Sequence, residues 1–387
     1  MCSSSIFSAK LLKQSIVIYI FTIVIGILYI GSLYWCLFFG FQNRIDAGFS
    51  NYYGFMKLGL IGILILCLFF TSEANAQEVI PIYADYLTDN LYLLHPSMAG
   101  ASNYNKVRLT ARQQWFDVND APSLQTLSIH ARVGEKIGLG AIVFNDRNGN
   151  YSKQGAYATF AYHLLFSRSE LDLNQLSFGI NAGVVQHNLD QSGFIGFDPV
   201  IGGGNASEKY ANMDVGMSYY YRDFFAHLTA KNILLVKRDL FYSNGIAGNL
   251  RKYLFSTGYV FSKSNSPWSF EPSVLFQMRE ETDEKSIDVN FKTYRNFEIG
   301  DLWGGISYRR SFEGAEYITD GTKVKNQQLQ HFTSFVGFEY NQFLFAYTYT
   351  HQINSIVLSN NGFHQITLGY NFGKNRERYE CNCPAIN

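Results

Sequence analysis

The fold is decided by residues 106–149, KVRLTARQQWFDVNDAPSLQTLSIHARVGEKIGLGAIVFNDRNG. Apolar and polar side chains alternate there over three successive runs, 106–115, 124–133 and 136–144. Successive side chains of a strand point to opposite faces, so this alternation predicts three strands with one apolar and one polar face each. The apolar faces hold Val107, Leu109, Ala111 and Trp115, then Leu127, Ile129, Ala131 and Val133, then Ile137, Leu139, Ala141 and Val143.

The same alternation recurs to the end of the chain and predicts about fourteen strands in all. Most runs approach the roughly nine to eleven residues that a tilted strand needs to cross a bilayer. The further predicted strands are 154–166, 175–187, 212–221, 223–233, 251–262, 267–279, 285–294, 301–312, 331–340, 343–351 and 363–372.

Short and long connections alternate between these strands. Residues 134–135, 222–223 and 341–342 are short connections, whereas 188–211, 234–250 and 313–330 are long. Short periplasmic turns, long outer loops and an even strand count are typical of bacterial outer-membrane barrels. The sequence therefore predicts an all-β fold, a transmembrane antiparallel β-barrel in the outer membrane.

Composition favours this barrel over a soluble alternative. Two packed β-sandwiches would hide their apolar faces against each other and explain the alternation equally well. However, charged residues make up only 16 % of the chain, against about 25 % in soluble domains, and Phe and Tyr number 33 and 27. A net charge of zero argues against nucleic acid as a partner, because phosphate binding needs a basic surplus. Membrane lipid is the expected surrounding.

The first 76 residues read as export signals. Residues 15–41 are almost wholly apolar and long enough for a membrane helix, but residues 56–76 form a second start, with Met56-Lys57, an apolar run and Ala74-Asn75-Ala76. This is the pattern of a signal peptide cleaved after Ala76, so residues 1–55 are interpreted as an over-extended N-terminus, with a membrane anchor as the alternative. The predicted order is then a periplasmic lead (77–105), the barrel (106–372) and a periplasmic tail (373–387).

Several motifs, in order, resemble the PorP/SprF family. They are NLYLLHPSMAG (90–100), ARQQW (111–115), DAPSLQTLS (120–128), KIGLGAIVFNDRNG (136–149), AYATFAYHL (156–164), LSFGINAGV (176–184) and ITLGYNFGK (366–374). One departure is Ser97, which stands where the family has alanine after the proline. Within this pattern the family-motif and lumen-facing candidates are Pro96, Gly100, Arg108, Arg112, Gln114, Trp115, Pro122, Arg132, Gly138, Gly140, Asp146 and Gly149.

The resemblance implies a non-enzymatic outer-membrane component of the type IX secretion system of Bacteroidetes, the pathway that also exports gliding-motility adhesins. Members of such a family would help to deliver or anchor an exported, adhesin-like surface protein. Their partners would be that cargo and other secretion subunits on the periplasmic side. A passive porin-like channel for small solutes is the alternative function.

The inward faces offer little catalytic chemistry. Ser128 and His130 share one face, but residues two apart on a strand lie roughly 6–7 Å apart, too far for a nucleophile–base hydrogen bond. An interior polar network is the simpler interpretation, and a hydrolase is the alternative. Arg108, Arg112 and Arg132 point the same way; they would pair with barrel carboxylates or form a cationic track for an anionic ligand.

Two other local features are weak signals for a ligand. The oxygens of Asp146, Asn148 and Asn150 suggest a calcium loop, but Gly149 is out of place and no glutamate follows at the twelfth position, so a plain turn is favoured. In the tail, Cys381 and Cys383 are too few to complete a zinc site. They would contact a periplasmic partner or belong to an incidental chain end. The sequence therefore predicts no cofactor.

Overall fold

The computed structural model describes residues 85–117, 120–166, 173–192, 204–234, 251–263, 266–280, 284–319, 323–354 and 362–373, with only the backbone given for 313–319, 323–327 and 354. The chain separates into two units, residues 1–72 and 73–387, and all described residues belong to the second. The predicted signal peptide and over-extended N-terminus therefore lie outside the described residues. In the described part, no helix combines the length and hydropathy needed to cross a bilayer.

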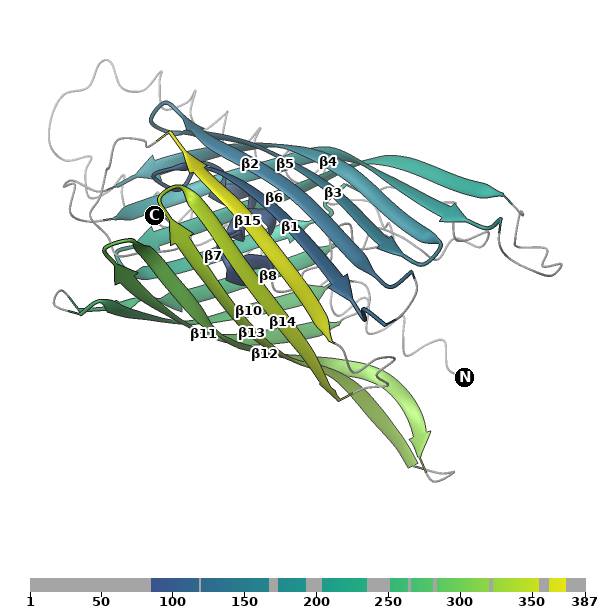
Figure 1. The fold of residues 1–387 in the computed structure, drawn as a ribbon. Helices are drawn as coiled ribbons and strands as arrows, with labels where there is room; N and C mark the ends of the chain where they lie inside the picture. The colour runs from purple at the N-terminus through teal and green to yellow at the C-terminus, as the bar shows by residue number, and fades with distance from the viewer. Residues whose placement is uncertain are drawn as a thin grey trace, which may run out of the picture. The chain divides into compact units, whose positions relative to one another are not determined.

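The second unit is a closed antiparallel β-barrel (Figure 1). Each strand pairs with its neighbours in the sequence, and β1 closes the barrel by pairing with β15. The fifteen strand segments make fourteen strands of the barrel, because β8 and β9 both pair with β10, are separated only by Val260 and so count as one interrupted strand. The prediction of about fourteen strands is confirmed. The strands are β1 (Asn105–Gln114), β2 (Ser123–Val133), β3 (Ile137–Asn148), β4 (Tyr151–Leu165), β5 (Asn174–Asp190), β6 (Asn205–Tyr221), β7 (Phe224–Lys231), β8 (Lys252–Tyr259), β9 (Phe261–Ser262), β10 (Trp268–Arg279), β11 (Lys285–Phe297), β12 (Gly300–Thr319), β13 (Lys323–Tyr340), β14 (Phe343–Asn354) and β15 (Phe363–Phe372).

Strand pairing extends into two of the three predicted long loops. Of residues 188–211, both ends belong to β5 and β6, which stay paired as far as Asp190 and Asn205, and residues 193–203 lie outside the described residues. Residues 313–330 fall largely within β12 and β13, paired as far as Thr319 and Lys323. Strand pairing satisfies the hydrogen bonds of backbone N–H and C=O groups that would otherwise bond to water in a loop. Both hairpins project beyond the neighbouring strands (Figure 1). The third predicted loop, 234–250, lies outside the described residues apart from its first residue.

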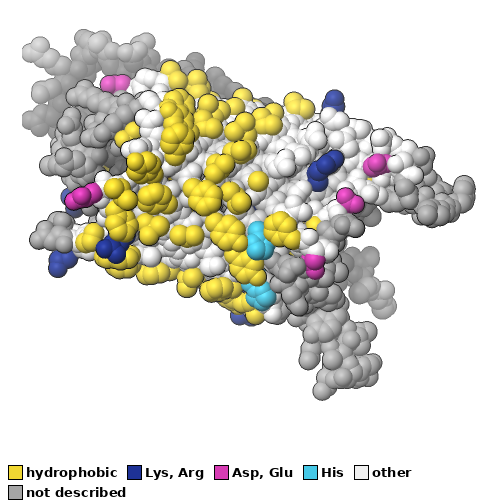
Figure 2. Space-filling model, viewed as in Figure 1, with side chains coloured by type: hydrophobic (Ala, Val, Ile, Leu, Met, Phe, Trp, Pro, Cys, Tyr) yellow, Lys and Arg dark blue, Asp and Glu magenta, His cyan; other side chains and the backbone are white. Residues whose placement is uncertain are grey.

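The outward face is apolar over a continuous band. Leu127 and Val143, which are register partners, are 46 % and 52 % exposed, as befits side chains that meet lipid. Figure 2 shows hydrophobic side chains spread over the nearest face, with charged ones toward its edges. The end of the barrel where the β5–β6 and β12–β13 hairpins project is here called the hairpin end. On the side of the Leu127–Val143 pair that faces this end, a row of outward polar register partners borders the apolar band across five strands: Gln125, Asn145, Gln154, Gln186 and Lys209.

The barrel interior is filled by residues 85–103, which precede β1 and are here called the plug. It holds three short 3-10 helices, η1 (Asp85–Thr88), η2 (Leu91–Leu93) and η3 (Pro96–Met98). Pro96 starts η3, where its fixed backbone angle suits the first helical position. The plug contacts β4, β5 and β6 through η3 and β13 and β14 through η1. The sequence predicted a periplasmic lead over residues 77–105; the structure instead places 85–103 inside the barrel, where glycines leave room for them.

Candidate functional site: the plugged lumen

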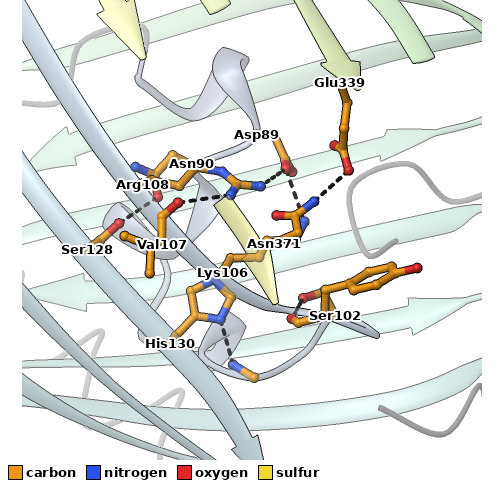
Figure 3. A network of polar contacts seen from close by, with 12 residues as sticks. Asp89, Asn90, Ser102, Lys106, Val107, Arg108, Ser128, His130, Glu339 and Asn371 are labelled. Atoms are coloured by element: carbon orange, nitrogen blue, oxygen red, sulfur yellow. Dashed lines mark hydrogen bonds and ion pairs between the residues drawn. The ribbon is translucent and has the colours of Figure 1, made fainter. Parts of the chain in front are cut away.

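An ion-pair cluster fixes the middle of the plug to β1 (Figure 3). The Asp89 carboxylate accepts from Lys106 Nζ at 3.0 Å and from Arg108 Nη2 at 2.9 Å. Asp89 lies outside the membrane-spanning strands. Burial alone would raise the pKa of its carboxyl, but the two cations outweigh burial and hold that pKa below its ordinary value. Asp89 is therefore ionised and binds both cations at neutral pH.

Hydrogen bonds attach the rest of the plug to strands on every side. Near its start, Tyr86 OH donates to Asp288 Oδ2 on β11 at 2.6 Å. Near its end, His130 Nδ1 on β2 accepts from the backbone N–H of Gly100 at 3.1 Å. Between these points, bonds join Thr88 to Thr367, Tyr92 to Thr159, the Leu93 carbonyl to Lys231, His95 to Thr229 and Ser256, Ser97 to Ser218, and the Ala99 carbonyl to His163. The plug is thus part of the folded barrel.

His95 illustrates how a polar plug side chain is accommodated. Its two ring nitrogens bond Thr229 Oγ1 at 2.8 Å and Ser256 Oγ at 3.1 Å, and its ring stacks on His227 with centroids 4.7 Å apart. Burial, and after it the neighbouring His227 and Lys231, lower the pKa of His95 well below its ordinary value. The imidazole therefore stays neutral, and its hydrogen bonds replace those it would make with water.

Inward-facing glycines let the plug backbone touch the wall. A Cβ on Gly138 of β3 would overlap the carbonyl oxygen of Ala99, and a Cβ on Gly179 of β5 would overlap the backbone of Pro96 and Ser97. On β6, a Cβ on Gly216 would come within 3.0 Å of Pro96 Cδ. Gly100 has φ +67°, a left-handed conformation that glycine adopts without penalty. Strands β3, β5 and β6 therefore form a seat shaped for η3.

Ser128 and His130, the pair weighed for catalysis, each contact the plug. Ser128 Oγ donates to Asn90 Oδ1 at 3.4 Å, and His130 is the acceptor for Gly100. Both side chains are buried within the lumen. Their bonds therefore serve to hold the plug.

The three inward arginines have separate surroundings. Arg108 pairs with Asp89, Arg132 Nη2 donates to Gln175 Oε1 at 3.4 Å, and the Arg112 guanidinium lies 5.2 Å from the centre of the Phe363 ring. The structure thus distributes the arginines over different partners instead of joining them in one cationic track. Among the described residues, no group of three or more His, Cys, Asp or Glu side chains could hold a metal ion.

A family model described as type IX secretion system membrane protein PorP/SprF matches residues 75–370. The chain belongs to the PorP/SprF family. The match spans the plug and nearly the whole barrel, so both are covered by the PorP/SprF pattern. A search of curated proteins found no match to the chain.

Solved outer-membrane barrels are similar only at a distance. The CymD monoaromatic hydrocarbon channel is 10 % identical, with a TM-score of 0.43 over 75 % of this chain and 94 % of CymD. A deltaS2 mutant of the TodX monoaromatic hydrocarbon channel is 12 % identical, with a TM-score of 0.43 over 74 % and 94 %. CdiB from Acinetobacter baumannii is 8 % identical, with a TM-score of 0.35; 70 % of this chain matches 60 % of CdiB.

The other PorP/SprF motif residues lie in two places. Pro96, Gly100, Gly138 and Gly140 are at the seat of the plug, where Gly140 faces the Tyr92 ring. The rest lie toward the hairpin end. Three backbone hydrogen bonds join residues there: the Gln114 N–H donates to the Pro122 carbonyl, the Trp115 N–H to the Gly362 carbonyl and the Gly149 N–H to the Asp120 carbonyl. The carboxylate of Asp146 lies 3.7 Å from Lys153 Nζ. Cys381 and Cys383 lie outside the described residues.

The sequence analysis did not identify most of the plug contacts. No motif marked Tyr86, Asp89 or Gly216. His95 and Gly179 lie within the quoted motifs 90–100 and 176–184 but were not singled out as candidates. A signal was nevertheless present, because glycines occupied inward positions of β3 where the alternation calls for polar side chains. Glycine within a strand often marks a close backbone approach.

Proposed function

We propose that this PorP/SprF protein is a non-enzymatic outer-membrane component of type IX secretion that helps to deliver or anchor an exported, adhesin-like surface protein. The observation that carries the proposal is the plug, which fills the lumen and bonds strands from β1 round to β15. A conducting channel needs an open lumen, whereas a barrel that binds partners at its ends does not.

The two ends of the barrel suit different partners. The projecting β5–β6 and β12–β13 hairpins offer a surface for the exported cargo. The opposite end has short turns, such as residues 222–223, and would face the other secretion subunits in the periplasm. In this arrangement the signal peptide is cleaved after Ala76, and Cys381 and Cys383 belong to a periplasmic tail.

The test is deletion of the gene, followed by quantification of each adhesin-like protein on the cell surface and in the medium. Loss of at least one such protein from the surface, restored by the wild-type gene, supports the proposal. If every surface adhesin is still exported and retained, the proposal is refuted. A tagged copy purified from membranes then identifies the cargo and the secretion subunits by what co-purifies.

A hairpin variant sharpens this test. Shortening β12–β13 by joining residue 313 to residue 329 through a two-residue turn removes the projecting part and leaves the pairing from Arg310 and Gln330 inward. We expect the shortened protein to assemble in the membrane and to lose cargo retention. Steady open conductance of the wild-type protein in planar bilayers would instead favour the porin function.

A further inference from the structure

A hollow lies on the outward face of the wall from β1 to β6, where the apolar band meets the polar row. It is here called the outer hollow, and its volume is about 650 Å³. Ligand sites typically measure roughly 300–1,000 Å³, so it has room for part of a lipid. The outward side chains that line it are Leu109, Leu127, Val143, Ala156 and Val184 in the apolar band, and Gln125, Asn145, Gln154, Gln186 and Lys209 in the polar row.

The register explains the apolar part of the outer hollow. Ala156 on β4 stands between Val143 on β3 and Val184 on β5. Its methyl group is shorter than the branched side chains on both sides, and the two valines are 52 % and 57 % exposed. A hydrocarbon chain lying over Ala156 therefore contacts apolar atoms on both sides, and many such weak contacts add up to a useful attraction.

The polar part of the outer hollow carries positive charge. Lys209 is exposed, and the four other polar lining residues of the row are neutral amides. The next outward row toward the hairpin end is Ser123, Arg147, Ser152, Asn188 and Ser207. Within the described residues, these two rows thus hold two cations and no carboxylate. The nearest outward acid further along β5 is Asp190, which accepts a hydrogen bond from Ser192. An anionic occupant is therefore favoured.

The height of Lys209 on the wall points to a lipid headgroup as that anion. Along β6, Lys209 precedes the short turn at residues 222–223 by 222 − 209 = 13 residues. At about 3.3 Å per residue and a strand tilt of about 40°, this is a rise of roughly 33 Å. The apolar band of an outer-membrane barrel is about 25 Å tall, so Lys209 lies beyond the hydrocarbon layer, at the level of the headgroups.

We propose that the outer hollow binds a membrane lipid with an anionic phosphate headgroup, with the phosphate at Lys209 and one acyl chain over Ala156. The ammonium group of Lys209 donates charge-assisted hydrogen bonds to the phosphate oxygens. The exposed amide of Gln154, two strands away in the same row, donates to the headgroup from the other side. The inference does not depend on the proposed role in secretion, because the site is formed by the outer wall of the barrel.

Native mass spectrometry of the full-length protein, released from a neutral detergent, tests the site. The protein is titrated with dimyristoyl phosphatidylglycerol or with dimyristoyl phosphatidylcholine, which has the same acyl chains but a headgroup of zero net charge. One cation near a membrane surface favours an anionic lipid by about fivefold in affinity. We expect phosphatidylglycerol to bind more tightly by that factor. Equal affinities for the two lipids overturn the proposal.

Charge variants assign this preference to the outer hollow. Lys209→Gln removes the charge at similar side-chain length and should abolish the fivefold preference. Arg310→Gln makes the same change in charge at an exposed arginine on the outward face of β12, outside the hollow, and should keep the preference. Heat-modifiable gel mobility checks that both variants are folded. A preference that survives Lys209→Gln, or that both variants lose equally, overturns the proposal.

Two further measurements test whether the acyl chain takes part. Ala156→Phe fills the apolar part of the outer hollow and should weaken phosphatidylglycerol binding, whereas Ala131→Phe, the same change on the outward face of β2 outside the hollow, should bind as wild type. Glycerol 3-phosphate carries the phosphate without acyl chains and should not displace the lipid at equal concentration. Displacement by glycerol 3-phosphate, or equal binding by the two folded phenylalanine variants, overturns the assignment to a lipid.

Discussion

Replacing Asp89 by asparagine should release the plug from the barrel wall. The amide has the size of the carboxylate but no charge, so packing around η1 and η2 is retained while both ion pairs are lost. Lys106 and Arg108 lie 3.0 and 2.9 Å from Asp89, and their side chains are only 4 % and 1 % exposed. The substitution therefore leaves two buried cations without the carboxylate that they bind.

The size of the effect follows from this burial. Removing one partner of a buried ion pair costs about 3–5 kcal/mol, because an uncompensated charge remains in a poorly solvated site. The asparagine oxygen still accepts one hydrogen bond, which favours the lower end of the range. At about 1.4 kcal/mol per factor of ten, the ratio of seated to unseated plug falls roughly 100-fold or more.

Single-channel recording and thermal unfolding measure this change. We expect wild-type protein in planar bilayers to be closed, and Asp89→Asn to show frequent openings and a lower unfolding temperature. Asp190→Asn is the matched control, since that carboxylate is exposed and bonds only the nearby Ser192 among the contacts described. If Asp89→Asn matches wild type in both conductance and unfolding temperature, the ion pairs do not hold the plug.

Three further outcomes are expected. The first concerns acid. The pKa of folded Asp89 is held below its ordinary value of about 3.9, so the ion pairs stabilise the plug above that pH and are lost only as the pH falls through the lower pKa. Wild-type channels should therefore stay closed at about pH 5 and open below about pH 4, and opening already at about pH 6 would contradict this. Gly138→Val forces side-chain atoms into the plug backbone and should destabilise the protein by about 1–3 kcal/mol, measured as a lower unfolding temperature. Gly204→Val is the control and should leave the unfolding temperature unchanged, because no atom lies within 4 Å of a Cβ at that position. Equal effects of the two substitutions would show that close contact with the plug at Gly138 does not contribute to stability. Leu139→Arg within the apolar band should cost about 2–4 kcal/mol of stability in lipid vesicles, and Gln125→Arg in the polar row beside the band should cost much less. Folding yields in vesicles measure this difference, and equal yields would show that Leu139 does not face the lipid core.

The barrel was predictable because lipid and lumen impose opposite demands on alternate residues. Val107, Leu109 and Ala111 point outward and Arg108, Thr110 and Arg112 inward, as the alternation required. Strand ends beyond the bilayer were less predictable. Residues 187–190 and 205–208 pair as a hairpin, yet they lie past the polar row and so carry no apolar face to mark them.

The plug was not predictable from periodicity, because its conformation comes from the cavity that surrounds it. Residues 85–103 form 3-10 turns too short to show a period, and their polar side chains resemble those of an exposed segment. Only the completed barrel brings Asp89 to Lys106 and His95 to Ser256. The clue within the sequence was on the wall, at Gly138 and Gly140, where residues facing the lumen lack side chains.

The plug also bears on how a cargo meets this barrel. A polypeptide that passed through the lumen would have to displace residues 85–103, breaking the Asp89 ion pairs and the hydrogen bonds of Tyr86, His95 and Ser97 together. The released polar groups on the wall would then need new partners, each at a cost of about 1–3 kcal/mol if left unsatisfied. Contact at the outside of the barrel requires none of this, since the β5–β6 and β12–β13 hairpins already project beyond the rim. Under the proposed function we therefore expect a cargo held at the hairpin end and not threaded through the lumen, so cargo retention should survive Asp89→Asn but not removal of the β12–β13 projection.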